Sequence, residues 1–413
     1  MSPLTRREFL KALGGFSAIP VLGRKLSWLD QLTQAQNQMV DVYVARNGSP
    51  ITNVSRVIET AGGIQRFVDY DDVVVLKPNG QWPNQGYTHT QCIKALIDVI
   101  LSRPGGFAGE IILIEHVHRD PTEAMSGNYC WNMSQSNRVN NWPDMNYLEL
   151  IADYQNRGFP YVTADPLYDS NQPKWEKVTG PASVGPGNQG WVHTSYTTAA
   201  NGRTVELSYP ILRSSYSNKL IDLKNGVWQG GDYTGQKVKL IFLPTLNNHG
   251  GFNYEDYAGP TSALKTHIGM VEFGNLTDYT LHGVGYNNPI SPQAMGESVG
   301  YLITQLLTPA FYMTCAEFTG YRGRTNTNAA HTKTVGLCTD PVTLDYWMCK
   351  YVLYPCATSQ DFMNPDNDNN LRKALVGCQS KGVGTILEAE MNVHLSDLSL
   401  DKHIFLPVVV YSL

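Results

Sequence analysis

The sequence carries little charge and has no lysine- or arginine-rich stretch beyond its first residues. Charged residues make up 16% of the 413 positions, and the formal net charge is −5. Because binding to nucleic-acid phosphates requires a basic surface, we expect no nucleic-acid partner. After the N-terminal segment, no apolar run is long enough to cross a bilayer, so we also expect no transmembrane segment.

Two kinds of motif are also missing. The chain has seven cysteines but no C-x-x-C pair, which argues against an iron–sulfur cluster and against a zinc ribbon. The glycine-rich stretch "GPASVGPGNQG" contains no G-K-[ST], which argues against a phosphate-binding loop.

An exported chain can form disulfides, but an odd number of cysteines leaves at least one thiol unpaired. Cys315 and Cys338 lie in apolar runs, where a buried thiol in the core is expected.

The N-terminal residues have the order of a twin-arginine export signal. The stretch "TRREFLK", with Arg6 and Arg7, is followed by a short apolar stretch and then by polar residues. This order directs folded proteins to the twin-arginine translocon, while an ordinary basic helix is the alternative. We predict a signal peptide over residues 1–35, cleavage before Gln36, and a periplasmic or extracellular mature protein.

Strand and helix patterns alternate along most of the remaining chain. Continuous apolar runs such as "VVVL", "IILI" and "LIFL" are typical of strands that are buried on both faces of a parallel sheet. Helical spacing is present over residues 89–102 and 344–353. We therefore predict an α/β fold with a largely parallel central sheet flanked by helices. The predicted strands are Val40–Arg46, Val73–Leu76, Glu110–Glu115, Val238–Leu243, Phe311–Glu317 and Thr334–Cys338.

The middle of the chain, residues 160–236, has a different pattern. Asn-Gly pairs begin at Asn201 and Asn225, and short alternating runs surround them. This pattern is typical of antiparallel hairpins. We predict a β-rich insertion or lid within an α/β domain that spans residues 36–413.

Polar residues follow the apolar runs at the point where each strand is expected to end. The carboxyl ends of parallel strands meet at one edge of a sheet, and ligands bind there. Any strand end lies near solvent, so polar residues are also expected without a site, and Asp340-Pro341 fits a helix N-cap. The residues in question are Lys77, Asn79, Glu115, His116, Asn247, His249, Glu317 and Asp340.

A second concentration of polar residues lies in the glycine-rich stretch 247–270. His249, Lys265 and His267 occur there, and these residue types serve acid–base chemistry or metal binding. Ordinary loop histidines that only bind the backbone would give the same pattern. Because loops at strand ends carry chemistry more often than cores do, we include all three as candidate site residues.

Four motifs, taken in order, resemble the DUF362 family. They are "VVVLKPN", "LPTLNNHGG", "TSALKTHIGM" and "LCTDPVTLDYW". The resemblance covers most of the mature chain and implies a shared fold and site, but it implies no particular reaction. Asn247 stands where the family usually has lysine, and Thr266 where it usually has asparagine. The matching positions are Lys77, Pro78, Asn79, His249, Thr261, Lys265, Gly269, Asp340, Pro341 and Asp345.

Three functions are compatible with these residues. The first is binding or conversion of a small polar or anionic molecule. Its cations would be Lys77 and Lys265, its acid–base groups His249 and His267, and its further ligand contacts Asn79, Asn247 and Asp340. The second is a protein that binds a divalent metal ion through His249, His267 and Glu115. The third is a cell-surface binding module that uses aromatic residues of the β-rich middle.

Overall fold

The computed structural model describes residues 39–141, 145–251, 253–257, 259–273, 280–281, 290–357 and 360–399. The predicted export signal lies outside these residues. Within them, no helix combines the length and the apolar character that a membrane crossing requires.

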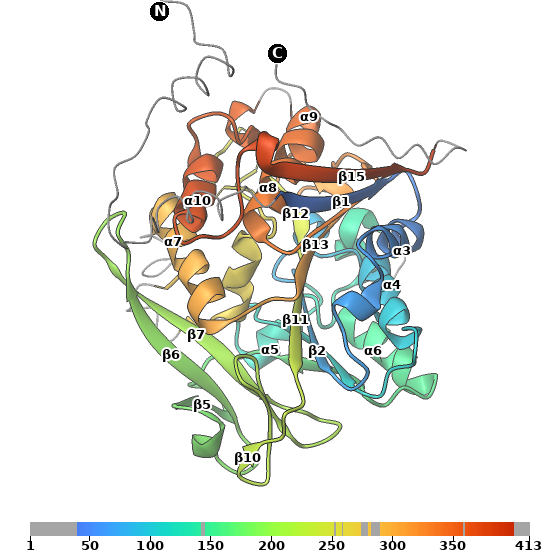
Figure 1. Ribbon diagram of the computed structural model, residues 1–413, viewed down its shortest axis with the longest axis vertical. Helices are drawn as coiled ribbons and strands as arrows, with labels where there is room; N and C mark the ends of the chain where they lie inside the picture. Colours follow the sequence, from blue (N-terminus) through green and yellow to red (C-terminus); the bar gives the residue numbers. More distant parts are fainter. Residues whose placement is uncertain are drawn as a thin grey trace, which may run out of the picture. The chain divides into compact units, whose positions relative to one another are not determined.

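Nine strands form the main sheet in the described part of the chain (Figure 1). Their order is β15 (Met391–Asp397), β1 (Val40–Arg46), β14 (Thr334–Cys338), β13 (Phe311–Gly320), β11 (Val238–Leu243), β2 (Val73–Pro78), β3 (Glu110–Glu115) and β4 (Val162–Pro166), with β12 (Thr245–Asn247) paired to β13. The strands from β13 to β4 in this order run parallel to one another. The predicted α/β class with a mostly parallel central sheet is therefore confirmed.

One strand departs from the predicted arrangement. β14 runs antiparallel to both β13 and β1, and its last residue Cys338 pairs with Tyr312 at the start of β13. Asp340 therefore lies beside the beginning of β13, whereas Glu317 lies near its end. The expectation that all these strand ends share one edge is wrong for Asp340. Pairing direction depends on the partner strand, which the local sequence does not specify.

Helices pack on both faces of the main sheet (Figure 1). Side chains alternate between the faces, so Val74 and Leu76 point to one hydrophobic core while Val73 and Val75 point to the other. On the first face lie α3 (Pro50–Thr60), α4 (Thr90–Leu101) and α6 (Tyr147–Asn156), and on the second α7 (Pro292–Tyr301), α8 (Pro341–Met348) and α10 (Asn370–Gln379). Shorter helices are α5 (Pro121–Ala124) and α9 (Tyr354–Cys356), and π-helical turns over Leu302–Leu306 and Cys349–Leu353 follow α7 and α8.

A second sheet is built from the β-rich middle of the chain. It contains β5 (Trp175–Val178), β6 (Gln189–Thr197), β7 (Thr204–Arg213), β8 (Leu220–Asp222), β9 (Gly226–Gln229) and β10 (Asp232–Tyr233). All its pairs are antiparallel except β5 with β6. β4 also falls within residues 160–236, but it pairs with β3, so the second sheet begins only at β5. A hydrogen bond of 3.1 Å from Gln189 to Asp165 links the two sheets.

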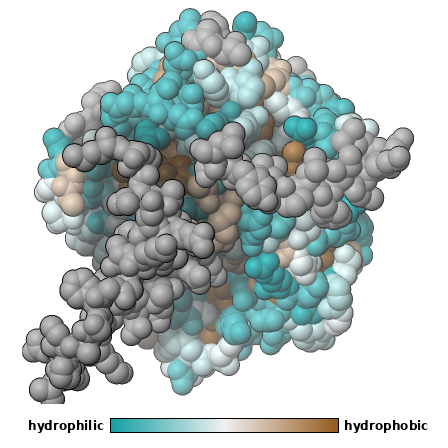
Figure 2. Space-filling model, turned by 45° about the horizontal axis from the view of Figure 1, so that its top comes forward, coloured by the Kyte–Doolittle hydropathy of each residue, from teal (hydrophilic) through white to brown (hydrophobic). Residues whose placement is uncertain are grey.

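One face of the described surface is mostly hydrophilic (Figure 2), and the cysteines are mostly buried. On the face shown in Figure 2, hydrophilic residues cover most of the described surface, and apolar residues show mainly in hollows between them. All seven cysteines are free thiols, and six of them are buried. Cys315 and Cys338 lie inside strands, as predicted.

The segment from Thr261 to Phe273 lies against the carboxyl ends of β2 and β3. It contains one 3₁₀ segment, η6 (Lys265–Met270). Its start is held by Asp345 of α8, whose two carboxylate oxygens accept hydrogen bonds from the main-chain N–H groups of Ala263 and Leu264, both at 2.7 Å. This carboxylate therefore determines where the segment leaves the core and enters the region of the strand ends.

We expect Asp345→Ala to lower the free energy of unfolding by roughly 2–4 kcal/mol, because two buried N–H groups lose their acceptor. Asp368, whose side chain is 87% exposed, provides the matched control Asp368→Ala. Urea denaturation of both variants measures the difference. Equal stability of the two variants would contradict the role assigned to Asp345.

Candidate functional site

A buried ion pair joins the carboxyl ends of β2 and β3. Lys77 Nζ lies 2.6 Å from Glu115 Oε2, and the two side chains are 0% and 2% exposed. Lys77 also donates a hydrogen bond of 3.2 Å to Thr266 Oγ1 in η6. Burial raises the pKa of Glu115 to about 7 and lowers the pKa of Lys77, although each charge opposes the shift of the other. Burial therefore disfavours the charged form of each partner, and the attraction between the two charges offsets part of that cost.

Gly269 lets η6 lie directly against this ion pair. A Cβ atom at Gly269 would be 2.6 Å from Lys77 Nζ and 2.9 Å from Glu115 Oε1. Its φ and ψ angles of −78° and 18° are open to any L-residue, so the close contact, not the backbone, requires glycine. The main-chain N–H of His116 donates to Gly269 O at 3.0 Å and so links η6 to the residue that follows β3.

His267, which was predicted to act as an acid–base group, is buried in the core. Its Nδ1 donates to Leu264 O at 2.9 Å, and its Nε2 accepts from the Tyr312 hydroxyl at 3.1 Å. Burial lowers the pKa of His267 to about 4, so the ring is neutral at pH 7. Both ring nitrogens are used, and His267 is placed to fix η6.

Asn79 and Asn247 brace loops near the same strand ends. Asn79 Oδ1 accepts from Thr245 N at 3.0 Å, and Asn247 Nδ2 donates to Gln85 O at 2.7 Å. Asp340 caps α8, since its carboxylate accepts from Thr343 N at 2.8 Å. The helix-cap alternative for Asp340 is thus confirmed.

The predicted cation Lys265 belongs to a separate cluster. Lys265 Nζ lies 2.5 Å from Asp256 Oδ1, with the lysine side chain 6% exposed. Arg324 interacts electrostatically with both of these groups. Its guanidinium donates a hydrogen bond to the main-chain oxygen of His249. Lys265 therefore forms the ion pair with Asp256, and Arg324 adds a second positive charge close to that pair while it binds the main chain of His249.

Aromatic rings and a hydroxyl hold this cluster in place. The guanidinium carbon of Arg324 lies 4.5 Å from the centroid of the Trp82 ring, and Lys265 Nζ lies 5.4 Å from that of Tyr257. His249 Nδ1 lies 2.6 Å from Thr261 Oγ1 at the start of the 261–273 segment. Each cation is thus placed over a ring face, where the attraction is electrostatic.

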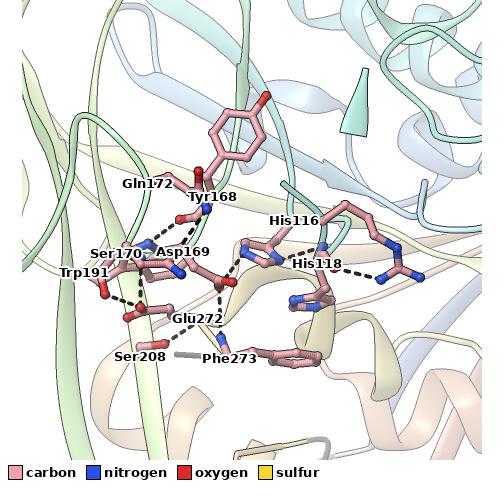
Figure 3. Close-up of polar contacts among 12 residues, drawn as sticks. His116, His118, Tyr168, Asp169, Ser170, Gln172, Trp191, Ser208, Glu272 and Phe273 are labelled. Atoms are coloured by element: carbon pink, nitrogen blue, oxygen red, sulfur yellow. Dashed lines mark hydrogen bonds and ion pairs between the residues drawn. The ribbon is translucent and has the colours of Figure 1, made fainter. Parts of the chain in front are cut away.

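A third polar cluster extends from the end of β3 (Figure 3). His116 Nε2 donates to Asp169 Oδ1 at 3.1 Å, while its Nδ1 accepts from the main-chain N–H of His118 at 3.0 Å. Asp169 also accepts from Phe273 N at 3.4 Å. The His118 ring stacks on Phe273 with centroids 3.5 Å apart. Because an N–H group faces its Nδ1, this nitrogen of His116 is the acceptor and Nε2 is the donor.

The same cluster reaches the second sheet through Glu272. This carboxylate accepts hydrogen bonds from the main chain and hydroxyl of Ser170, and its main-chain N–H donates to Ser208 Oγ at 2.8 Å (Figure 3). His193 Nε2 of β6 lies 2.5 Å from Glu272 Oε2. Burial on its own would raise the pKa of Glu272, but the hydrogen bonds from His193 and Ser170 outweigh it, and the net shift is downward.

The structure brings some of the predicted residues together. Lys77 contacts Thr266, which is next to Lys265 in the chain, and His249 is bonded to the start of the same segment. No sequence pattern singled out Asp169, His193, Glu272 or Arg324. They lie outside the predicted strand ends, and only long-range contacts assemble them.

The predicted metal ligands His249, His267 and Glu115 do not fit a divalent ion. Both nitrogens of His267 are bonded to other groups, and Glu115 is paired with Lys77. Among the described residues, no group of three His, Cys, Asp or Glu side chains is arranged to hold a metal ion. Glu317 is likewise paired, with His331 Nε2 at 2.7 Å.

No protein-family model, curated protein or solved structure matches this chain. The likeness to the DUF362 family accordingly remains a prediction from its four motifs.

Because the Lys77–Glu115 pair is buried, we expect the stability lost on replacing Lys77 to depend on pH. The pKa of Glu115 is about 7 in the folded state, above its value of 4.5 when unperturbed, so its ionisation destabilises the fold as pH rises through this range. Lys77→Met removes the charge that opposes this shift. We expect a loss of about 3–5 kcal/mol at pH 8 and a smaller loss at pH 5, where Glu115 is protonated.

The double variant Lys77→Met/Glu115→Gln is expected to recover part of the stability lost at pH 8, because no buried charge remains. Urea denaturation at pH 5 and pH 8 measures both effects. Equal losses at the two pH values, without recovery in the double variant, would refute the assignment.

Gly269→Ala tests the close contact with the ion pair. We expect a loss of roughly 1–3 kcal/mol, because the added methyl group displaces Lys77 or Glu115. Gly180→Ala is the control, since a Cβ at Gly180 meets no atom within 4 Å. Thermal unfolding compares the two, and a Gly269→Ala protein as stable as the control would show that the turn has room for a side chain.

Proposed function

We propose that the protein binds a small anionic molecule at the Lys265–Asp256–Arg324 cluster, next to the segment that covers the carboxyl ends of the parallel strands. One observation carries the proposal. Lys265 is paired with Asp256 and Arg324 interacts electrostatically with both groups, so two positive charges and one negative charge give the trio a net charge of +1 when all are ionised. A carboxylate, sulfate or phosphate group complements such a trio, since a guanidinium binds two oxygens at once.

Burial increases the electrostatic stabilisation that an anion would provide at this cluster. The pKa of Lys265 is lowered to about 8 by burial, with Asp256 opposing the shift and Arg324 adding to it. A partly desolvated cation gains more from a nearby anion than a solvated one does. Ligand binding is therefore expected to stabilise the protonated form of Lys265.

His249 is the acid–base group that we assign to any conversion of the bound anion. Its main-chain oxygen accepts from Arg324, and its Nδ1 is bonded to Thr261, so the ring is held beside the two cations. The Lys77–Glu115 pair acts indirectly, because it holds Thr266 and thereby positions the neighbouring Lys265. Lys77 is fully buried and is assigned no direct contact with the ligand.

Export and a relationship to the DUF362 family are part of the same proposal. Support for them comes from the "TRREFLK" stretch and from the four motifs. The alternative of a surface module that binds through aromatic residues has less support. Trp175 and Trp191 of the β-rich middle are buried in the core, which leaves Tyr216 and Tyr233 as its exposed aromatic residues.

Isothermal titration calorimetry with sulfate and with small carboxylates tests the proposal. We expect Lys265→Met to weaken binding about tenfold or more, since one charge-assisted contact is lost. Lys237→Met is the control, because Lys237 is 67% exposed and pairs with Asp69 elsewhere on the surface. No heat with any anion, or equal affinity in the two variants, would overturn the proposal.

The pH dependence of sulfate binding gives an independent check, because the charge of sulfate is constant over the range used. With the pKa of Lys265 at about 8, the cation is largely protonated at pH 7 and largely neutral at pH 9. We therefore expect affinity to fall by roughly tenfold between these values. Titrations at pH 7, 8 and 9 measure this change, and a flat profile would exclude Lys265 as the binding cation.

A further inference from the structure

We propose that the second sheet carries a separate binding site for a small zwitterion, an α-amino acid or a molecule of that class. The site is a pocket with a volume of about 540 Å³, within the range of pockets that hold small molecules. None of its lining residues belongs to the Lys265–Asp256–Arg324 cluster. They are Lys177, Val178, Thr179, Val192, His193 and Glu206.

The pocket presents one charge of each sign. Lys177 comes from β5 and Glu206 from β7, with β6 between these strands. A ligand carboxylate is complementary to Lys177, and a ligand ammonium group to Glu206. A simple anion would meet Glu206 as a like charge, and a simple amine would meet Lys177 in the same way. A molecule with both groups satisfies both residues.

The rest of the lining suits the remainder of such a molecule. Val178 and Val192 add apolar surface, against which an aliphatic side chain can pack. Thr179 adds a hydroxyl that can donate or accept a hydrogen bond. Two opposite charges beside valine and threonine side chains favour a compact amphoteric ligand over a neutral sugar.

Glu206 is held in place before any ligand arrives. Its Oε2 accepts a hydrogen bond of 2.8 Å from Ser195 Oγ, and its Oε1 lies 3.4 Å from His193 Nδ1. The side chain remains 30% exposed, so it is anchored and still reachable. A carboxylate fixed in this way loses little side-chain entropy when it binds an ammonium group.

His193 is a positioning residue for this pocket. Its Nε2 lies 2.5 Å from Glu272 Oε2, and the Glu272 side chain is 0% exposed. Ser170 in turn donates two hydrogen bonds to Glu272. The imidazole is thus clamped between a buried carboxylate and the carboxylate of the pocket. This chain of contacts gives a physical reason for a buried, ionised Glu272 between the pocket and the polar cluster at the end of β3.

Calorimetry with the full chain tests the site. A thermal-shift screen of the standard α-amino acids selects the ligands for titration, with valine, isovalerate and isobutylamine as a matched set. Isovalerate lacks the ammonium group of valine, and isobutylamine lacks its carboxylate. If the pocket takes aliphatic zwitterions, valine binds at least tenfold more tightly than either analogue.

Substitutions in the pocket separate the two charges. We expect Lys177→Met to weaken zwitterion binding at least tenfold and Glu206→Gln to abolish the preference for valine over isovalerate. Lys237→Met and Lys265→Met are controls that leave zwitterion binding unchanged, so failure of the sulfate site and failure of this site are distinguishable. Lys177 is exposed and Glu206 is partly exposed, so both variants are expected to fold.

His193→Gln tests the clamp through selectivity instead of stability. A misplaced Glu206 lowers the ratio of valine to isovalerate affinity, whereas a merely structural role would leave that ratio unchanged. The proposal is overturned if no amino acid produces a shift or heat. It is also overturned if isovalerate binds as tightly as valine, or if Lys177→Met and Glu206→Gln both bind as the unmodified protein does.

Discussion

The buried Lys77–Glu115 ion pair connects three parts of the chain that are far apart in sequence. Lys77 lies at the end of β2 and Glu115 at the end of β3, and η6 packs against them through Thr266 and Gly269. Removing one member of a buried pair leaves an uncompensated charge, which is far more costly than replacing both. The pair therefore constrains the strand ends and η6 together, and the position of Lys265 follows from it.

The segment from Thr261 to Phe273 connects the buried ion pair with both proposed sites. Near its start, Thr261 holds His249 and Lys265 meets Asp256. Near its end, Glu272 clamps His193 beside the pocket of the second sheet. Asp345 fixes the beginning of the segment through two main-chain N–H groups. One ordered stretch of chain thus supports two groups of charged residues with different ligand preferences.

Charge is scarce in this sequence, and several of the charged side chains are buried with a partner. Burial of an unpaired charge is costly, so each buried carboxylate or ammonium group is expected to have a counter-charge or hydrogen bonds. Lys77 and Glu272 follow this rule within the protein itself. Lys265 pairs with Asp256 and Arg324 adds a second positive charge close to that pair, and this excess of positive charge is the physical basis for assigning an anion to the cluster.

Local patterns in the sequence were enough to identify the α/β class and the bounds of β1, β3, β11 and β14. In β3, β11 and β14, burial on both faces leaves a continuous apolar run that can be recognised without knowledge of the partner strand. The N-cap formed by Asp340 could also be predicted from the sequence, because an N-cap is a contact within one turn of the chain. The antiparallel direction of β14, the burial of His267 and the clamp of Glu272 on His193 were decided only by the folded chain. Each depends on which distant residues pack together, and the free energy of that packing is a property of the whole core, not of any short stretch.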